Sequence, residues 1–452
     1  MASLRGSRFV FVALIVASCG GDDASTADSP LPATATPSVP GKSDVATPAS
    51  TSASRGIVST DLVLDLTTRT GRATLTLETG SLPPTFEVGD LRIDAVSTSS
   101  GTVVGHSRSA EGHLVVDVTS RTTKLIIEYG FSKHGHFDGW DATPGFTFLW
   151  PDHCGNLFPC HSAPADGTTF SLEVLGVPEG QTAVYPREVP AAAPAYQLGI
   201  AVGPYLYEPL GTTPSGTEVG VYFTSATRAA ALTGASRLPE YFAFLEQTLG
   251  DYLYGKTVAS VAVDWGPGDF GGLEHHPFWH IDDGQIGDPY THAHEAAHGW
   301  FGGAVRMACW EDFVLSEGTS TYLAARAIEA VDGPTAGAAL WQVFGTELLE
   351  MIETGDDTVA WLPDTCNAIS IAEHPLWSLA VYYRGAFFLR AVEAEVGRAA
   401  LDATLAELYR RHGGASAAGV PDLLDLIEDS TGFDPSDLAT LWLLSTGAPP
   451  GL

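Results

Sequence analysis

The stretch His294-Glu295-Ala296-Ala297-His298, continued by Gly299-Trp300-Phe301-Gly302, decides how the whole chain is interpreted. Residues four apart lie on one face of a helix, so both imidazoles can reach one metal ion. Glu295 follows the first histidine and can act as general base toward water at that metal. A catalytic zinc site needs three protein ligands and one open position. Glu317, nineteen residues after His298, is the expected third ligand.

This motif has a simpler explanation that must be weighed. Two histidines on a helix can be exposed polar residues, and HExxH also arises by chance. Glu317, however, belongs to the second helical stretch Asp312-Phe313-Val314-Leu315-Ser316-Glu317-Gly318, at a suitable downstream distance. The combination favours a metal site that holds one zinc ion.

Composition excludes one large class of partners. The chain has 452 residues, enough for two or three domains, with 54 acidic against 22 basic residues and a formal charge of −32. Nucleic-acid binding needs a basic face, so no nucleic-acid partner is expected. The charge suits a soluble, exported protein, and a monomer is expected.

The N-terminus resembles an export signal. A short basic region precedes the apolar run Phe9–Ala17, which is too short to span a membrane. Val16-Ala17-Ser18-Cys19 is similar to a bacterial lipobox, in which cleavage leaves a lipidated cysteine. The alternative is ordinary cleavage nearby with an incidental cysteine. We therefore predict a lipoprotein signal over residues 1–19, with Cys19 as the lipidation site.

The following segment, residues 20–55, is rich in Ser, Thr, Pro and Ala and has no apolar period. Such a composition cannot bury enough surface to fold, so a disordered linker is predicted. Its expected role is to tether the folded body to a membrane, with the lipid as the only membrane contact. The resulting location is the bacterial cell envelope, on a periplasmic or extracellular face.

Four cysteines remain after Cys19. In an exported protein they are expected to be paired. Cys154 and Cys160 are close enough to close a small loop, which would leave Cys309 and Cys366 for each other. Three connectivities are possible, and the spacing does not choose among them.

Hydrophobic periodicity divides the body into two parts. Residues 56–207 contain short alternating segments such as Leu62-Val63-Leu64, which predict an N-terminal β-sandwich domain. Between Glu208 and Gly220, prolines and glycines predict a connecting loop. Residues 208–452 are predicted to be mostly α-helical, with a small sheet ahead of the zinc helix. The fold class is therefore multidomain, β followed by α.

Two further segments contain side chains that could act on a substrate if they lie beside the zinc helix. Gly271-Gly272-Leu273-Glu274-His275 is, by itself, a turn with a surface carboxylate. Next to a metal centre, Glu274 could hold the α-amine of a peptide through a charge-assisted hydrogen bond. Tyr382-Tyr383 lies early in a predicted helix, where packing is the usual role of tyrosine. In a zinc peptidase, a phenol can instead stabilise an oxyanion.

Together these motifs resemble the gluzincin aminopeptidases, the family that includes aminopeptidase N and leukotriene hydrolase. The resemblance extends from about residue 57 to the C-terminus, and the motifs occur in the family's order. It implies that residues 208–452 form a thermolysin-like catalytic domain. It also implies zinc held by three residues, a general base, a transition-state tyrosine and an exopeptidase motif that binds the substrate's N-terminus. The matching positions are His294, His298 and Glu317 for zinc, Glu295 for the base, Tyr382 for the tyrosine, and Gly272, Glu274 and His275 for the exopeptidase motif.

The chain departs from the family pattern at several points. Leu273 stands for the family Met, His275 for Asn and Arg384 for Lys. The histidine leaves recognition of the amine end less certain. The chain also stops after the catalytic domain, so the resemblance implies a short form with an open cleft. The additional imidazoles His275, His276, His280 and His292 are expected to be cleft or surface residues.

The expected activity is zinc-dependent removal of N-terminal residues from peptides or proteins. Two alternatives stay open at this level. One is a zinc endopeptidase of the same fold, favoured if Glu274 does not face the cleft. The other is a surface-anchored binding protein without catalysis, which the complete set of ligands, base and tyrosine argues against.

Overall fold

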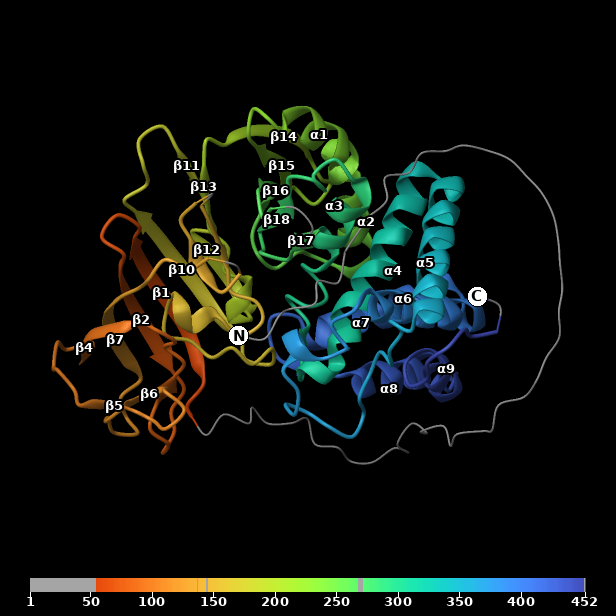
Figure 1. The fold of residues 1–452 in the computed structure, drawn as a ribbon. Coiled ribbons are helices and arrows are strands. Elements are labelled where there is room, and N and C mark those ends of the chain that lie inside the picture. The colour runs from red at the N-terminus through yellow and green to blue at the C-terminus, as the bar shows by residue number, and fades with distance from the viewer. Residues whose placement is uncertain (1–53, 136, 144, 267–270, 451) are drawn as a thin grey trace.

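A computed structural model shows a β-rich N-terminal part beside a mostly helical C-terminal part (Figure 1). It describes residues 54–135, 137–143, 145–266, 271–450 and 452. The predicted signal segment 1–19 with Cys19, and nearly all of the linker 20–55, lie outside the described residues. The order of a β part followed by a helical part agrees with the predicted class.

The largest sheet of the N-terminal part has six strands in the order β12-β10-β1-β2-β7-β4. Its strands alternate buried and partly exposed residues, as expected when one face covers a core. Leu62, Leu64 and Leu75 are buried on that face. β1 pairs with β10 in parallel, and the remaining neighbours are antiparallel. The strands are β1 (Ile57–Asp65), β2 (Thr70–Leu77), β4 (Arg92–Thr98), β7 (Lys124–Gly130), β10 (Thr168–Leu175) and β12 (Glu188–Ala193).

Two smaller sheets complete the N-terminal part. The first has the order β11-β13-β9-β8, and the second has the order β3-β6-β5. β9 matters for function, because the chain runs from it directly to Trp150 in the cleft described below. The strands are β3 (Thr85–Phe86), β5 (His106–Arg108), β6 (Leu114–Val116), β8 (Gly139–Asp141), β9 (Phe146–Phe148), β11 (Thr182–Val184) and β13 (Ala201–Gly203).

The segment 208–220, predicted as a connecting loop, is instead part of a sheet. β14 (Leu206–Thr212) and β15 (Glu218–Phe223) pair as an antiparallel hairpin in the order β14-β15-β16-β18-β17. Pro209 is tolerated because β14 is the edge strand, where a missing N–H breaks no inner ladder bond. The pairing register shifts between Pro209 and Gly211, so Gly211 is accommodated as an irregularity in the strand. The prediction of a loop was therefore wrong.

This five-stranded sheet is the small sheet expected ahead of the zinc helix. Its inner strands β16 (Thr257–Val263) and β18 (Phe278–Asp282) are parallel neighbours. β17 (Gly272–Leu273) pairs antiparallel with β18 at the sheet edge. Glu274, the residue that follows β17, therefore lies next to the zinc helix.

Proline marks the boundary between the first two helices. α1 (Arg228–Gly234) ends before Pro239, which lies in the first turn of α2 (Leu238–Leu249). The zinc helix α3 (Pro289–Ala297) packs on α4 (Phe313–Asp332), and α4 packs on α6 (Leu379–Val396). The remaining elements are α5 (Pro334–Thr354), α7 (Arg398–His412), α8 (Val420–Thr431), α9 (Ser436–Trp442) and the short pair β19 (Arg306–Met307) and β20 (Ala417–Ala418). In the part of the chain that the structure describes, no helix is long and apolar enough to cross a membrane.

Candidate zinc site and active-site cleft

The zinc helix begins at a well-defined cap. Asp288 accepts hydrogen bonds from the backbone N–H groups of Tyr290 and Thr291, and Pro289 occupies the first turn. Capping fixes where the helix starts, and hence which side chains face α4. His294 and Glu295 lie in the last turns, and His298 terminates the helix.

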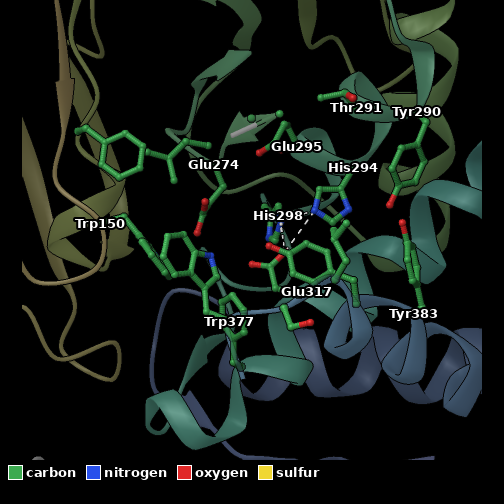
Figure 2. Close-up of a pocket in the computed structure, with 18 residues that line it drawn as sticks. Trp150, Glu274, Tyr290, Thr291, His294, Glu295, His298, Glu317, Trp377 and Tyr383 are labelled. Carbon is green, nitrogen blue, oxygen red and sulfur yellow. Dashed lines mark hydrogen bonds and ion pairs between the residues drawn. The ribbon is translucent and has the colours of Figure 1, made fainter. Parts of the chain in front are cut away.

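Three side chains converge as the sequence predicts (Figure 2). The Nε2 atoms of His294 and His298 are 3.1 Å apart, and each lies 3.3 Å from Oε2 of Glu317. A tetrahedral zinc ion with bonds of about 2.0–2.1 Å requires donor atoms about 3.3 Å apart. All three residues are buried. The donor set therefore fits a zinc ion.

Hydrogen bonds behind the imidazoles orient them. His298 Nδ1 lies 3.1 Å from the Phe301 carbonyl and 3.1 Å from the Ser320 hydroxyl. A proton on Nδ1 can be donated to that carbonyl, which leaves the Nε2 lone pair for a metal. His294 Nδ1 lies 3.5 Å from the Thr321 hydroxyl. Both backing hydroxyls come from α4, the helix that also carries Glu317.

The charges of these three groups favour the binding of a cation. Burial opposes the charge of Glu317, but His298 and His294 lower the pKa of Glu317 to about 2. Burial would lower the pKa of His298, yet the adjoining Glu317 carboxylate raises it to about 10. A divalent cation bound between these groups would be stabilised by the Glu317 carboxylate and would displace protons from the imidazoles.

Glu295 points into the same cleft. It is buried, and its Oε2 atom has no hydrogen-bond partner among the described residues. Burial, followed by the nearby carboxylates, raises the pKa of Glu295 well above its usual value, against the opposing effect of His298. A carboxylate with a free oxygen and an elevated pKa is suited to accept a proton from water and return it.

Gly272 makes room for this base. A Cβ atom at position 272 would lie 2.3 Å from Oε1 of Glu295, so any larger residue would collide with the carboxylate. Glu274 lines the cleft two residues later. Burial raises the pKa of Glu274 to about 7, with a smaller contribution from Glu317 and opposition from His298. Glu274 is therefore placed where a positively charged amine would restore its charge.

The structure corrects the expectation for the additional histidines. His275, His276, His280 and His292 are all buried, and none lines the cleft. Successive side chains of an extended segment point to opposite sides, so a cleft-facing Glu274 turns His275 away. His275 instead lies against His280, with their Nδ1 atoms 3.0 Å apart. The predicted substrate contact of His275 is thus wrong.

His276 has a structural role that sequence reasoning missed. Its Nε2 lies 3.0 Å from the backbone carbonyl of Glu295, and Nδ1 lies 2.8 Å from the Tyr252 hydroxyl. With the tyrosine donating to Nδ1, Nε2 carries the proton that is donated to the carbonyl. This link ties the segment that carries Glu274 to the segment that carries the base. No sequence pattern signals such a long-range pair.

Tyr382 lies over the imidazole of His294. Its ring stacks on His294 with centroids 5.7 Å apart and planes 19° apart, and it lines the cleft. Burial, reinforced by Glu317 and Glu274, raises the pKa of Tyr382 well above 10. The phenol therefore stays protonated and can donate a hydrogen bond to developing negative charge.

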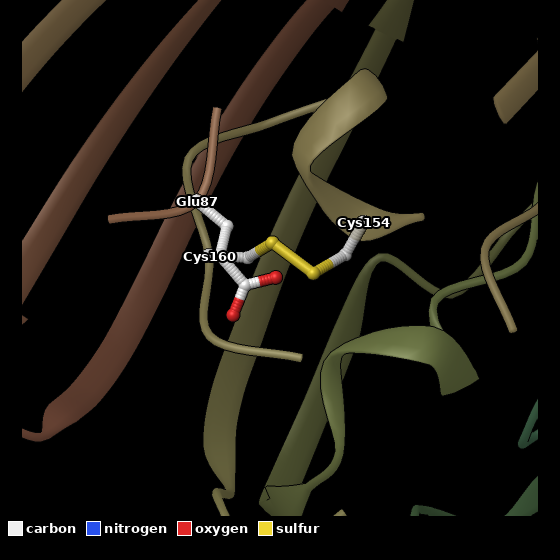
Figure 3. A group of neighbouring side chains, drawn as sticks. All are labelled: Glu87, Cys154 and Cys160. Atoms are coloured by element: carbon white, nitrogen blue, oxygen red, sulfur yellow. A yellow bond between two sulfur atoms is a disulfide. The ribbon is translucent and has the colours of Figure 1, made fainter. Parts of the chain in front are cut away.

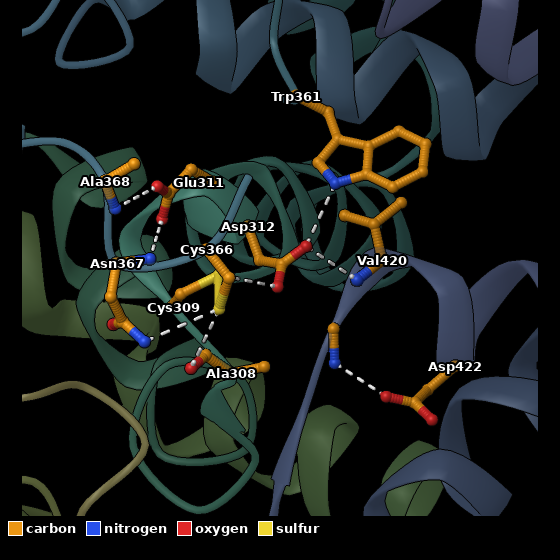
Figure 4. The surroundings of a disulfide bond; sticks show 11 residues. Ala308, Cys309, Glu311, Asp312, Trp361, Cys366, Asn367, Ala368, Val420 and Asp422 are labelled. Atoms are coloured by element: carbon orange, nitrogen blue, oxygen red, sulfur yellow. Dashed lines mark hydrogen bonds between the residues drawn. A yellow bond between two sulfur atoms is a disulfide. The ribbon is translucent and has the colours of Figure 1, made fainter. Parts of the chain in front are cut away.

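Two other clusters of metal-type side chains are disulfides. Glu87 lies beside Cys154 and Cys160, which are joined to each other (Figure 3). Cys309 and Cys366 are joined near Glu311 (Figure 4). A sulfur in a disulfide is not a thiolate ligand. The pairing also resolves the connectivity that the sequence left open.

The two disulfides close loops of different length, which predicts different contributions to stability. Cys154–Cys160 spans 6 residues, whereas Cys309–Cys366 spans 57. Replacing both cysteines of the longer loop is expected to cost about 4 kcal/mol in unfolding free energy, against about 2 kcal/mol for the shorter loop. Thermal and urea unfolding of both double variants, Cys309→Ala/Cys366→Ser and Cys154→Ala/Cys160→Ser, measures this. An equal or reversed order would contradict a loop-entropy origin.

Comparison with known proteins relates the helical part of the chain to a family of peptidases. Part of the chain is similar to the peptidase family M1 domain. The M1 match covers residues 290–442, from the zinc helix through α9. The chain is 26% identical over 328 residues to leucine aminopeptidase 2 of Eremothecium gossypii, covering 68% of this chain and 51% of that protein. It spans about half the length of the first curated relatives it matches.

Solved structures share the fold of most of this chain. An M1 zinc metallopeptidase from Deinococcus radiodurans aligns with a TM-score of 0.73 at 20% identity, covering 88% of this chain and 96% of that one. Native leukotriene A4 hydrolase from yeast aligns at 0.72 and 20% identity, covering 88% of this chain and 69% of that one. These comparisons confirm the resemblance to gluzincin aminopeptidases.

Proposed function

We propose that this chain is a zinc aminopeptidase that removes N-terminal residues from peptides. The observation that carries the proposal is the convergence of His294, His298 and Glu317 within 3.1–3.3 Å, beside a buried carboxylate with a free oxygen. The M1 match and relatives named leucine aminopeptidase support it. An M1 metallopeptidase solved with a Tyr-Ser-Ala substrate supports peptides as the substrate class.

Each residue of the proposed active site has a separate role in peptide hydrolysis. His294, His298 and Glu317 would hold one zinc ion, which supplies Lewis-acid polarisation of the carbonyl and an acidified water. Glu295 accepts the proton of the attacking water and delivers it to the leaving amine. Tyr382 donates to the oxygen that gains negative charge. Glu274 holds the α-amine, and Gly272 leaves room for substrate beside Glu295.

The same proposal includes the domain organisation and the location of the protein. Residues 56–207 form a β-sandwich domain and residues 208–452 a thermolysin-like catalytic domain, consistent with the β-rich and helical parts of Figure 1. Residues 1–19 are a lipoprotein signal with Cys19 lipidated, and 20–55 are a linker. The protein is a monomer at the bacterial cell envelope, on a periplasmic or extracellular face. The lipobox-like sequence is the support for that location.

A hydrolysis panel tests the proposal. It compares fluorogenic aminoacyl substrates with the same substrates N-acetylated, each with and without a zinc chelator. Cleavage of only the free-amine set, lost with chelator and restored by zinc, is expected. Cleavage of acetylated substrates would instead indicate an endopeptidase. Failure to cleave either set with one zinc bound per chain would favour the binding-protein alternative.

Removing the phenol of Tyr382 tests its role separately. Tyr382→Phe keeps the ring on His294 but removes the donor, so kcat is expected to fall about 10²–10³-fold with KM little changed. Steady-state kinetics and zinc content measure this. Tyr383→Phe is the neighbouring control, since that phenol donates to Glu347 rather than to the metal ligands. An equal loss in both variants would contradict the assignment.

A further inference from the structure

A second cavity lies between the two parts of the chain, away from the active-site cleft. Its walls come mainly from the N-terminal part, and Arg306 and Ala415 close it from the helical part. Its volume is about 440 Å³, within the range of about 300–1,000 Å³ that is typical of small-ligand sites. Glu78 and Ala415 are exposed, so the cavity opens to solvent. Among the described residues, it shares no lining residue with the cleft.

His161 lines this cavity and has one nitrogen without a partner. Its side chain is 8% exposed, and Nε2 lies 2.8 Å from the Thr85 carbonyl. A carbonyl only accepts, so Nε2 carries the proton and Nδ1 of the neutral ring has a lone pair. Nδ1 is buried and has no hydrogen-bond partner among the described residues. Because an unpaired buried polar atom is costly, this nitrogen is suited to accept a hydrogen bond from a ligand.

Asp166 places a carboxylate beside that nitrogen. Its Oδ2 atom lies 3.6 Å from Nδ1 of His161, which is too long for a direct hydrogen bond. Neither acceptor can satisfy the other while the imidazole is neutral. Two acceptors at this separation can share one donor group, such as an ammonium that donates to each of them. The pair therefore favours a ligand that carries an amine.

Arg306 supplies the opposite charge. It is buried and donates to the backbone carbonyls of Ala165, Ala192 and Ala415 at 3.1, 3.0 and 3.2 Å. Within the described residues, these bonds use three of the five N–H groups of the guanidinium, which leaves two for a ligand. A carboxylate is the usual partner of this planar donor group. Burial lowers the pKa of Arg306, and Asp166 is among the groups that oppose this shift, so the two charges lie close together.

The segment 161–167, which contributes the acceptors, is held at both ends. Near its start, Glu87 accepts a hydrogen bond from the Ser162 N–H at 2.9 Å. At its end, Gly167 packs so closely on Arg306 that a Cβ at this position would collide with the guanidinium carbon. The side chains of this segment are therefore in position before a ligand arrives, which lowers the entropic cost of binding.

We propose that this cavity binds a free α-amino acid, with the ammonium group between His161 and Asp166 and the carboxylate at Arg306. The described charged side chains that line it are Glu78, Asp166 and Arg306, so both signs of charge are present. An α-amino acid carries both charges on one carbon atom, which suits acceptors and donors that belong to one short segment and the arginine packed on it. The inference goes beyond the proposed function, which concerns the cleft. The two are related only through the product, since an aminopeptidase releases free amino acids.

Calorimetry with leucine tests this site in the zinc-loaded full chain at about pH 8, above the titration range of imidazole. The cleft could also bind leucine. The background is therefore Glu274→Gln/Glu295→Gln, in which the cleft lacks its proposed amine anchor and base. Leucine, leucinamide and N-acetylleucine are each titrated into this background with and without Asp166→Asn.

Asp152→Asn is the matched control. Asp152 and His153 form the same kind of pair, with Oδ1 and Nδ1 3.5 Å apart, but both side chains are partly or largely exposed to solvent. Neither residue lines the cavity or the cleft. The thermal midpoint of each variant is measured to confirm that it folds.

The expected result is one leucine bound per chain in the background, with an affinity that falls at least about tenfold in Asp166→Asn and is unchanged in Asp152→Asn. Leucinamide and N-acetylleucine each lack one of the two charges, and each should bind at least about tenfold more weakly than leucine. Absence of leucine binding, or binding that Asp166→Asn does not change, would overturn the inference. Equal affinity for leucine and either of the other two compounds would overturn the assignment to an α-amino acid.

This outcome is separable from the proposed function. If the parent chain hydrolyses no substrate but the background still binds leucine in an Asp166-dependent way, the proposed function fails and the cavity site stands. Hydrolysis by the parent without an Asp166-dependent leucine site would overturn the cavity site and leave the proposed function intact.

Discussion

Replacing Glu295 with glutamine is expected to lower kcat about 10²–10⁴-fold while the chain still binds zinc. Glutamine has nearly the same size, so the space beside Gly272 and the helix that carries the ligands are preserved. The amide cannot accept a proton from water or return one to the leaving amine. Because the three metal ligands are unchanged, the zinc content of Glu295→Gln should equal that of the parent.

Glu246 provides a matched control for this substitution. Like Glu295 it is buried, with one oxygen that has no described hydrogen-bond partner and a second that accepts from the Thr217 hydroxyl at 2.6 Å. It lies outside the cleft lining. Glu246→Gln should retain parental kcat. A loss below about tenfold in Glu295→Gln, or a similar loss in both variants, would reject Glu295 as the base.

Arg384→Met is expected to lower the free energy of unfolding by about 3–5 kcal/mol. Arg384 is fully buried in α6 and donates to Asp357 through two hydrogen bonds of 2.8 and 2.6 Å. It also donates to the Gly447 carbonyl at 2.9 Å, while the Gly447 N–H donates back to Asp357 at 2.7 Å. Methionine would leave the Asp357 carboxylate buried without its counter-charge.

The Arg384 variant has consequences for catalysis as well. Tyr382 lies two residues earlier in the same helix, so a shifted α6 would misplace its phenol. We expect a fall in the thermal midpoint of at least about 6 °C, together with a lower kcat. Arg384→Lys should retain part of the stability, because lysine keeps the charge but not the two-pronged donor geometry.

Controls for Arg384 use the same interaction in different surroundings. Arg92 also makes two hydrogen bonds to one carboxylate, that of Asp94, but on the surface. Arg92→Met should leave the thermal midpoint unchanged, since exposed pairs contribute little. Asp357→Asn should be destabilising, and its combination with Arg384→Met should cost less than the sum. Equal small effects at both arginines would contradict a buried-pair role for Arg384.

The proposed zinc site is the part of this protein that the sequence specifies most directly. The four-residue spacing of His294 and His298 holds on any helix, and a capped, apolar-faced segment makes that helix form. Glu317 is predicted because it occupies a second helix at a fitting distance. Local propensity and periodicity are short-range properties, so they also predict the strands of the N-terminal part.

Long-range packing explains the failures. The hairpin of β14 and β15 was missed because an edge strand tolerates Pro209, which local rules assign to a loop. His275 was expected at the substrate, but the alternation of side chains after β17 turns it toward His280. His276 was missed because its partners, Tyr252 and the Glu295 carbonyl, are defined only once strand and helix are packed.

By itself, then, the sequence determined the metal-binding motif, the order of a β part and a helical part, and the candidates Glu274, Glu295 and Tyr382. Only the tertiary structure decided that Trp150 and Trp377 meet beside Glu274 and that the cysteines pair as 154–160 and 309–366. Helical spacing is encoded within a few residues. Contacts between segments hundreds of residues apart depend instead on how two separate parts of the chain bury their apolar faces against each other.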